Sequence, residues 1–389
     1  MLRTYKYLLR PNPEQDQSLD FLLWQSRTIY NAALEQRVKT YQVTGKGIGY
    51  TAQWAHFRDV RHENPDTSGK INASSLQHLL RRLDKSFTAF FRRLKAGEKA
   101  GFPRFKSRRR FKSIEYTYGD GCKLRQDTQG RHSFYVQNVG ELRMCYHRPI
   151  PVGAEIKHAV VKRVGERWYV CLMLELPDSE RRLAQIGKQI GLDVGLKSLA
   201  ALSTGELIDN PRWWRESLAK LRRRERHASR QAKGSQRQKA TYRQIARLHQ
   251  HVANQRADYL HKLSHRLVAE NDLIAIEDLT LRFMNRNRHL SLASHDAGFG
   301  LFRQMLEYKA ESAGIPVIPV DPSNTTQACS GCGCIVPKGW SVRVHECPHC
   351  GLILDRDINA ARNILISALH NPLGRSGQPA TWAVAPCVG

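Results

Sequence analysis

The sequence predicts a multidomain α+β protein, in which a β-rich unit with an inserted helical block precedes a layered α/β unit. Apolar residues recur at helical spacing between residues 17 and 94, and residues 111–177 then have strand character. Beyond residue 187, hydrophobic strand segments alternate with helical ones, a pattern typical of α/β layers. At 389 residues the chain is long enough for two or three domains.

The first half predicts one strand, then helices, then more strands. The helices are a segment at 17–41 and an amphipathic stripe from Leu76 to Leu94, which we interpret as the core of a helical subdomain. The other face of that stripe, which could meet phosphates or solvent, carries Arg81, Arg82, Lys85, Arg92 and Arg93. Strands are predicted at 3–9, 134–136, 142–146, 160–164 and 168–176, the last two as a hairpin around Gly165-Glu166. The helical block is therefore expected between a first strand and the β-rich unit that the strand completes.

The second half begins with two hydrophobic strands after a boundary near Gly187. Strands are predicted at 189–196, 198–204, 273–279 and 317–320. Helices are predicted at 212–270, interrupted at Gly234-Ser235, and at 299–313. The tail after His370 has no periodicity and is expected to be irregular.

The charge balance indicates a polyanionic partner. Lys and Arg number 62 against 35 Asp and Glu, a net charge of +27. Two cationic runs are candidate nucleic-acid contacts. The first, for which a solvated basic loop is the alternative, comprises Arg104, Lys106, Arg108, Arg109, Arg110 and Lys112. The second comprises Arg222, Arg223 and Arg224. No apolar run approaches 18 residues and no signal peptide is evident, so membrane attachment is not expected.

Five of the nine cysteines fall within 22 residues, which favours a metal site in a reducing cytosol over a disulfide framework. Two CxxC pairs supply the four thiolates of a tetrahedral structural zinc, namely Cys329, Cys332, Cys347 and Cys350. The glycines after each pair, Gly333 and Gly351, suit tight knuckles with positive φ. Three further residues could also bind zinc, but their spacing fits a four-ligand site less well, namely Cys334, His345 and His349. Four thiolates leave no open coordination position, so a second metal would lie elsewhere.

Asp193 is the first candidate ligand for a hard divalent ion such as Mg²⁺. It lies in the apolar strand QIGLDVGL, on the face that it shares with Gly191 and Gly195. The two glycines are expected to leave room for a phosphate. A buried carboxylate is costly unless it binds a cation, and a capping or salt-bridged acid is the alternative.

Two further acidic positions complete the candidate set. Glu277 ends the strand LIAIEDL, at the strand end where open α/β sheets place their sites. Asp355 and Asp357 both lie near the start of a helix in LDRDINAARN, and either could cap it. From spacing alone the choice between them stays open, as does a supporting role for Arg356 or Asn359.

These motifs together resemble TnpB, the RNA-guided DNA endonuclease of insertion sequences (also called OrfB transposase), and the related compact type V CRISPR effectors. The resemblance rests on GFPRFKSRRR, IGLDVGLKSLAALSTGE, LIAIEDL, TTQACSGCG and HECPHCGLILDRDINAARNIL. One departure is TTQACSGCG, where many relatives carry TSQxCSxCG. The resemblance implies an RNase H-like (RuvC) nuclease with the catalytic triad Asp193, Glu277 and Asp357. Asp357 is chosen because the acid of the family precedes x-N-A-A.

The resemblance also implies a domain layout. Residues 1–9 and 100–185 would form a wedge β-barrel, with a helical recognition domain at 10–99. The RuvC-like nuclease domain would comprise 186–325 and 353–370, interrupted by a zinc ribbon that binds target nucleic acid at 326–352. An irregular tail would occupy 371–389.

The implied activity is cleavage of double-stranded target DNA beside a short adjacent motif, guided by a transposon-end RNA (ωRNA). The implied cofactors are one structural Zn²⁺ and two catalytic Mg²⁺, with Mn²⁺ as a substitute. We expect the protein to be a monomer. We expect it in the prokaryotic cytoplasm, associated with the nucleoid. The alternatives are a nuclease-inactive RNA-guided repressor and a protein-only zinc-ribbon DNA-binding factor; a strand-joining transposase is disfavoured.

Overall fold

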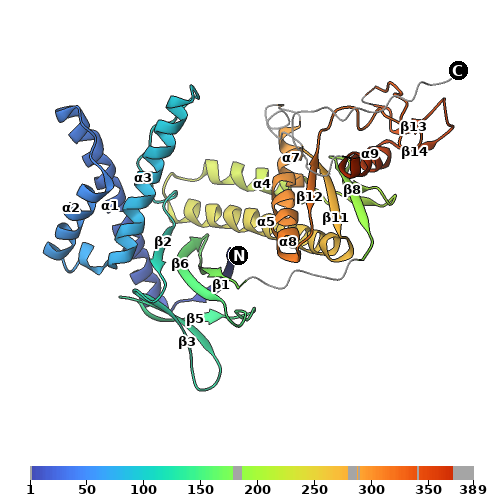
Figure 1. Ribbon diagram of the computed structural model, residues 1–389. Helices are drawn as coiled ribbons and strands as arrows, with labels where there is room; N and C mark the ends of the chain where they lie inside the picture. The colour runs from blue at the N-terminus through green and yellow to red at the C-terminus, as the bar shows by residue number, and fades with distance from the viewer. Residues whose placement is uncertain (1, 178–185, 279–286, 288–289, 340, 371–389) are drawn as a thin grey trace. The chain divides into compact units, whose positions relative to one another are not determined.

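The computed structural model describes residues 2–177, 186–278, 287, 290–339 and 341–370 (Figure 1). The chain divides into two compact units, Met1–Asp178 and Ser179–Gly389. The finer division into barrel, recognition domain, nuclease domain and ribbon stays a prediction, and the tail at 371–389 lies outside the described residues. No helix within those ranges is long and apolar enough to cross a membrane.

The first unit is a seven-stranded antiparallel sheet with helices inserted after its first strand. The strands are β1 (Leu2–Arg10), β2 (Ser113–Thr117), β3 (Cys122–Gln126), β4 (His132–Val136), β5 (Gly140–Cys145), β6 (Glu155–Val164) and β7 (Arg167–Glu175). The helices are α1 (Pro13–Thr44), α2 (Tyr50–Glu63), the short 3₁₀ helix η1 (Ser68–Lys70) and α3 (Ala73–Lys95). The sheet order is β2-β6-β7-β1-β5-β4-β3, so β1 lies in its middle. This confirms that the first strand completes the β-rich unit.

Local sequence accounts for the helix boundaries of this unit. α1 begins at Pro13, four residues before the predicted start, because Asn12 and Gln15 form a reciprocal capping box. The predicted stripe on α3 is confirmed, since Leu76, Leu80 and Leu83 are fully buried. α2 was not predicted; within it only Gln53 and Phe57 are buried, which leaves little apolar periodicity to detect.

The sheet of the first unit curls but does not close, so the expectation of a closed barrel is wrong. A flat sheet of seven strands is about 29 Å wide. Its edge strands β2 and β3 are joined only by residues 118–121, a link that spans at most about 18 Å, so the sheet must curve. Within the link, the Gly119 N–H donates to the Cys122 carbonyl, and Gly119 and Gly121 have positive φ. This tight turn directs β3 to β4, and no described pairing joins β3 to β2.

The second unit is a mixed sheet between helices. Its elements are β8 (Gln189–Val194), β9 (Ser198–Leu202), β10 (Leu207–Asp209), α4 (Trp213–Arg230), α5 (Gln236–Glu270), β11 (Leu273–Glu277), α7 (Ser291–Ala297), α8 (Phe299–Ala313), β12 (Val317–Val320), β13 (Val344–Glu346), β14 (Ile353–Asp355) and α9 (Arg356–His370). The main sheet has the order β10-β9-β8-β11-β12. β8 is central, parallel to β11 and antiparallel to β9. The predicted interruption of the basic helix is confirmed, since Ser235 caps α5.

The two faces of this sheet bury different residues. Ile190, Leu192 and Val194 of β8 share one hydrophobic core with residues of α5 and α8. Ala275 of β11 instead belongs to a smaller core with Ile364 and Ala368 of α9. The strand alternation therefore directs Gly191 and Asp193 toward α9, which runs beside β8 (Figure 1).

Gly191 is where α9 meets the sheet most closely. A Cβ atom at Gly191 would lie 2.1 Å from the Ala361 carbonyl oxygen and 2.9 Å from the Leu365 Cβ. Its φ lies outside the left-handed region, so glycine is needed here for space. The expectation that Gly191 leaves room for a phosphate is therefore wrong, because the helix backbone fills that room. At Gly195 a Cβ would lie 3.2 Å from the Ser198 carbonyl, so that position is not open either.

Gly191→Ala is expected to destabilise the second unit by about 3 kcal/mol, because the backbone of α9 cannot move aside without losing its packing. Urea unfolding measures this difference. Gly339→Ala is the matched control, since a Cβ there meets no atom within 4 Å. Equal stability of the two variants would contradict the role assigned to Gly191.

Candidate functional site

Three acidic side chains converge where β8, β11 and α9 meet. Leu192 pairs with Ile276 in the parallel ladder, so the following residues, Asp193 and Glu277, are neighbours on the face that α9 covers. Asp357 lies in the first turn of α9, one helical turn before Ala361, whose carbonyl lies against Gly191. The structure thus brings together all three acids selected from the sequence.

Two carboxyl groups of this cluster, those of Asp193 and Glu277, resist ionisation. Burial raises the pKa of Asp193 well above its usual range, and the charges of Glu277 and Asp357 raise it further, while Arg356 opposes them. Burial also raises the pKa of Glu277 to about 7, against the Thr325 hydroxyl, which lowers it. Buried acids that repel one another are stabilised by a shared cation. Oxygen donors of this kind fit a hard divalent ion.

The structure distinguishes the two aspartates that the sequence left open. One carboxylate oxygen of Asp355 accepts from the Asp357 N–H at 2.8 Å and the Ile358 N–H at 3.4 Å, so Asp355 caps α9. The Asp357 carboxylate instead lies 3.2 Å from the Arg356 Nε and 3.8 Å from Arg343. Asp357 is therefore free of the capping role, and its charge raises the pKa of Asp193 more than that of Asp355 does.

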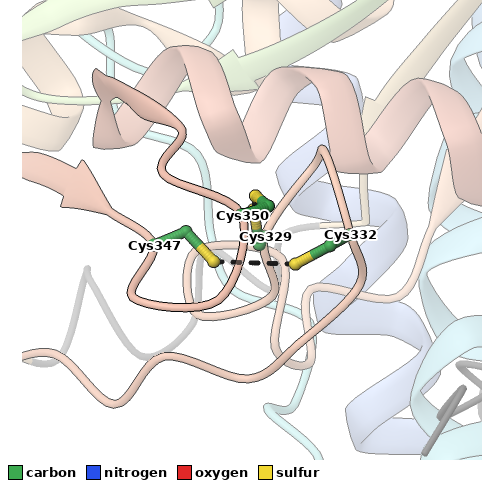
Figure 2. A group of neighbouring side chains, drawn as sticks. All are labelled: Cys329, Cys332, Cys347 and Cys350. Carbon is green, nitrogen blue, oxygen red and sulfur yellow. Dashed lines mark hydrogen bonds between the residues drawn. The ribbon is translucent and has the colours of Figure 1, made fainter. Parts of the chain in front are cut away.

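The four cysteines of the two CxxC pairs form one cluster. Figure 2 shows their side chains directed toward a common centre. Their sulfurs all lie within 4.8 Å of one another, with 3.6 Å for both Cys329–Cys350 and Cys332–Cys347. A tetrahedral zinc with bonds of about 2.3 Å separates its sulfurs by about 3.8 Å. The cluster therefore has the donor set and nearly the spacing of a structural zinc site.

The knuckle glycines adopt the conformation predicted for them. Gly333 and Gly351 have φ values of 79° and 72°, and their N–H groups donate to the carbonyls of Cys329 and Cys347. The spare ligands Cys334, His345 and His349 do not belong to the described cluster. Cys334 contributes its backbone carbonyl to the first knuckle, where it accepts from the Cys329 N–H.

Two buried asparagines on α9 hold the first knuckle against the helix. The Asn359 side chain accepts from the Ser330 N–H at 2.9 Å and donates to the Ala328 carbonyl at 2.7 Å. Asn363 donates to the carbonyls of Ala328 and Thr325 at 2.7 and 2.9 Å. Cys329 lies between the residues so bound, so the cysteine cluster and the acid-bearing helix share one set of hydrogen bonds.

Thr325 extends this connection to Glu277. Its hydroxyl lies 3.4 Å from a Glu277 carboxylate oxygen, and the residue is 2% exposed. The sequence analysis missed both Thr325 and Asn363. The i, i+4 spacing of Asn359 and Asn363 was a usable signal, because two amides so spaced share one helix face. Their partners lie about 30 residues upstream, and only the fold reveals them.

The basic segment before β2 is anchored to α1 by backbone hydrogen bonds. The Asn31 side chain accepts from the Lys106 N–H at 2.8 Å and donates to its carbonyl at 3.1 Å. The Lys106 ammonium lies 5.7 Å from the centre of the Tyr30 ring, and Arg108 is 3.5 Å from Asp20. The remaining cations of the segment are exposed, namely Arg104, Arg109, Arg110 and Lys112. A fixed backbone thus presents cations and the exposed ring of Phe105 to solvent.

The second basic run lies on α4, and its three arginines differ. Arg222 and Arg223 are exposed. Arg224 is partly buried and donates to the Gln244 side chain of α5. Arg222 and Arg223 are therefore available to a polyanion, whereas Arg224 contributes to the contact between the two helices.

Comparison with known proteins places the chain in a family. Residues 171–288 match the family described as probable transposase OrfB_IS605, and residues 299–364 match the Cas12f1-like TNB domain. A Streptomyces pristinaespiralis protein named for RNA-guided DNA endonuclease activity is 35% identical over 383 residues, which cover 94% of this chain and 89% of that protein. The chain belongs to the TnpB family of RNA-guided DNA endonucleases.

Another member of the family is similar along its whole length. The Escherichia coli K12 protein InsQ, also named for RNA-guided DNA endonuclease activity, is 28% identical over 400 residues, covering 97% of this chain and 96% of InsQ. Among solved structures, a Cas12f1–sgRNA–target DNA complex matches with a TM-score of 0.60 at 17% identity, covering 90% of this chain and 82% of that chain. The mixed helix and sheet fold is thus that of a compact type V effector.

The structure of the N-terminal region differs from the description of the family that it matches. Residues 1–46 match a family described as a helix-turn-helix domain. In the structure this region comprises strand β1, the single 32-residue helix α1 and the first residues after it. The described part of the segment therefore contains no pair of helices joined by a turn.

Glu277→Gln is expected to stabilise the magnesium-free protein by about 3 kcal/mol at pH 8, and not at pH 4. With a folded pKa of about 7, Glu277 binds its proton more tightly in the folded state than in the unfolded state. Folding therefore loses stability as the pH rises from about 4.5 to 7, and glutamine removes this loss. Urea unfolding at both pH values, with zinc present, measures the effect. Glu311→Gln, exposed on α8, is the control, and equal pH dependence of both variants would contradict this assignment.

Asn359→Ala is expected to speed release of zinc from the cysteine cluster to a chelator, because the Ser330 N–H loses its buried partner at a cost of about 1–3 kcal/mol. Zinc release is followed with a chromophoric chelator. Asn271→Ala is the matched control, since Asn271 is also buried but donates to Leu267 within its own helix turn. Equal release rates in the two variants would show that the asparagine does not retain the knuckle.

Proposed function

We propose that this protein is an RNA-guided DNA endonuclease whose Asp193, Glu277 and Asp357 hold divalent cations, Mg²⁺ in the cell with Mn²⁺ as a substitute. The observation that carries the proposal is the convergence of three acids from β8, β11 and α9, two of them with raised pKa values. Such a cluster is unfavourable by itself and favourable around a cation. Its relatives are named for this activity.

The residues around the cluster have separate tasks in this mechanism. Divalent ions held by Asp193, Glu277 and Asp357 would supply the activation of water and the stabilisation of the leaving oxygen of the phosphodiester. Asp193 and Glu277 lie on adjacent parallel strands, which hold the two carboxylates in a rigid relation. Asp355 caps the helix that carries Asp357, and the Thr325 hydroxyl orients the Glu277 carboxylate. The strand order, with the central strand bearing Asp193, supports assigning this unit to the RNase H-like (RuvC) class.

The nucleic-acid partners are a guide RNA and a double-stranded target DNA. The matched Cas12f1 structure is a complex with an sgRNA and a target DNA. A net charge of +27 suits two polyanions. The anchored segment at 104–112 presents cations beside the exposed ring of Phe105, which suits contact with phosphates and stacking on a base. The wedge, recognition, nuclease and ribbon boundaries expected from the family are part of this proposal.

The cysteine cluster is proposed to hold one structural zinc. Four thiolates complete a tetrahedral site and leave no position for a substrate. Hydrogen bonds from Asn359 and Asn363 place that site beside the helix that carries Asp357. Zinc therefore stabilises the neighbourhood of the acids without taking part in the reaction.

A nuclease-inactive RNA-guided repressor is the second candidate function. The retention of all three acids and their close approach in the fold favour cleavage over binding alone. A protein-only DNA-binding factor would bind DNA without a co-purifying RNA. Sequencing the RNA that purifies with the protein distinguishes that factor from either RNA-guided function.

Asp193→Asn is expected to lower DNA cleavage by about a thousandfold or more while RNA-dependent target binding is retained. The amide keeps the shape of the side chain and removes the charge that holds the cation. Cleavage of a labelled target and binding by gel shift, both with the co-purified RNA, measure the two properties. Asp258→Asn is the control, since Asp258 is an exposed acid paired with Lys262. Retained cleavage in Asp193→Asn would overturn the assignment of the site.

A further inference from the structure

A second cluster of metal-ligating side chains lies in the first unit, where the proposed nuclease mechanism does not use it. His78 of α3, Glu115 of β2 and His158 of β6 each offer one ligand atom, and these atoms lie within 4.8 Å of one another. β2 and β6 are paired, with Thr117 opposite His158. Glu115 and Thr117 are two residues apart, so they share the strand face on which His158 lies. α3 packs against β2 and brings His78 to this face.

The ring of His78 lies between a hydroxyl group and a carboxylate. Its Nε2 lies 3.0 Å from the Thr117 hydroxyl, and its Nδ1 lies 3.6 Å from a Glu115 carboxylate oxygen. In the tautomer that donates Nε2–H to Thr117, the Nδ1 lone pair is available to a metal ion beside the Glu115 carboxylate; in the other tautomer Nδ1–H faces that carboxylate. The separation is also too long for a hydrogen bond. A cation bound between the two atoms would select the first tautomer.

His158 contributes an unsatisfied nitrogen at the same place. Its Nδ1 is sealed from solvent and has no hydrogen-bond partner. A buried polar atom without a partner costs about 1–3 kcal/mol. The rings of His78 and His158 lie 5.1 Å apart and nearly perpendicular, so both belong to one small volume. The His158 ring therefore brings unused hydrogen-bonding capacity to the cluster.

We propose that His78, Glu115 and His158 bind a transition-metal dication of the zinc class. Two imidazoles and one carboxylate form a donor set that zinc accepts, with bonds of about 2.0–2.2 Å. Ligand atoms around such an ion lie about 3.4 Å apart, so the present separations, none above 4.8 Å, require at most small side-chain rotations. The Thr117 hydroxyl supplies the outer hydrogen bond that fixes the orientation of a ligating histidine.

The surroundings provide an entrance for the ion and room for a fourth ligand. The cluster lines a cavity of about 580 Å³ together with Arg81, Arg82 and Lys85. Arg81 lies over the Tyr50 ring at 5.6 Å and Arg82 over the Phe111 ring at 5.5 Å, so both guanidinium groups are engaged with aromatic faces. A bound ion would join α3 to the paired strands β2 and β6. The cavity then offers water or an anion as the fourth ligand.

The test is the zinc content of the untagged full-length protein after dialysis against Zn²⁺. Wild type is expected to hold two zinc ions per chain, one of them at the cysteine cluster. His158→Gln and Glu115→Gln are each expected to hold one, a twofold fall. X-ray absorption at the zinc edge is expected to show nitrogen and oxygen ligands in wild type, and sulfur ligands alone in the two variants.

His132→Gln is the matched control, because His132 lies on β4 of the same sheet and is not part of the cluster; it is expected to keep two zinc ions. Cys347→Ser is expected to keep the nitrogen and oxygen site alone. A wild-type protein whose zinc has sulfur ligands alone, or two zinc ions in both His158→Gln and Glu115→Gln, would overturn the proposal; a single zinc with nitrogen and oxygen ligands would instead overturn the assignment of the cysteine cluster. If His158→Gln does not fold, Glu115→Gln decides, since that side chain is 30% exposed and the amide preserves its shape. These outcomes do not depend on nuclease activity.

Discussion

The contact between Gly191 and the backbone of α9 is the constraint on which the acidic site depends. The absence of a side chain at Gly191 allows the Ala361 carbonyl to lie directly against β8. Asp193 is two residues along the strand from that contact, and Asp357 is one turn along the helix from it. A helix held farther from the sheet would separate the two carboxylates, and the mutual effect on the pKa of Asp193 would weaken.

α9 serves two sites because its residues divide between two faces. Asp357, Ala361 and Leu365 recur every four residues and form the face toward β8. Asn359 and Asn363 recur at the same interval but begin two residues later, about 200° around the helix. Their amides bind the first cysteine knuckle. One helix therefore holds Asp357 and the first cysteine knuckle together, and any movement of α9 would disturb both.

The acidic cluster is a local exception in a strongly cationic chain. Burial and like charges work against ionisation of Asp193 and Glu277, so the metal-free site is electrostatically unfavourable. The hydrophobic cores on the two faces of the sheet supply the stability that tolerates this arrangement. The acidic cluster lowers the stability of the metal-free fold at the position where the proposed chemistry needs negative charge.

Short-range pattern in the sequence determined much of this protein. The two CxxC pairs and their glycines specify knuckles within a few residues, so the cysteine cluster followed from spacing alone. Strand alternation placed Asp193 on the face opposite the hydrophobic core, and the structure agrees. Only the tertiary structure decided why Gly191 is glycine and which aspartate caps α9, because both depend on backbone groups brought together by packing. The open edge of the first sheet and the grouping of His78 with Glu115 and His158 likewise depend on strand pairing between distant segments, which residue spacing does not encode.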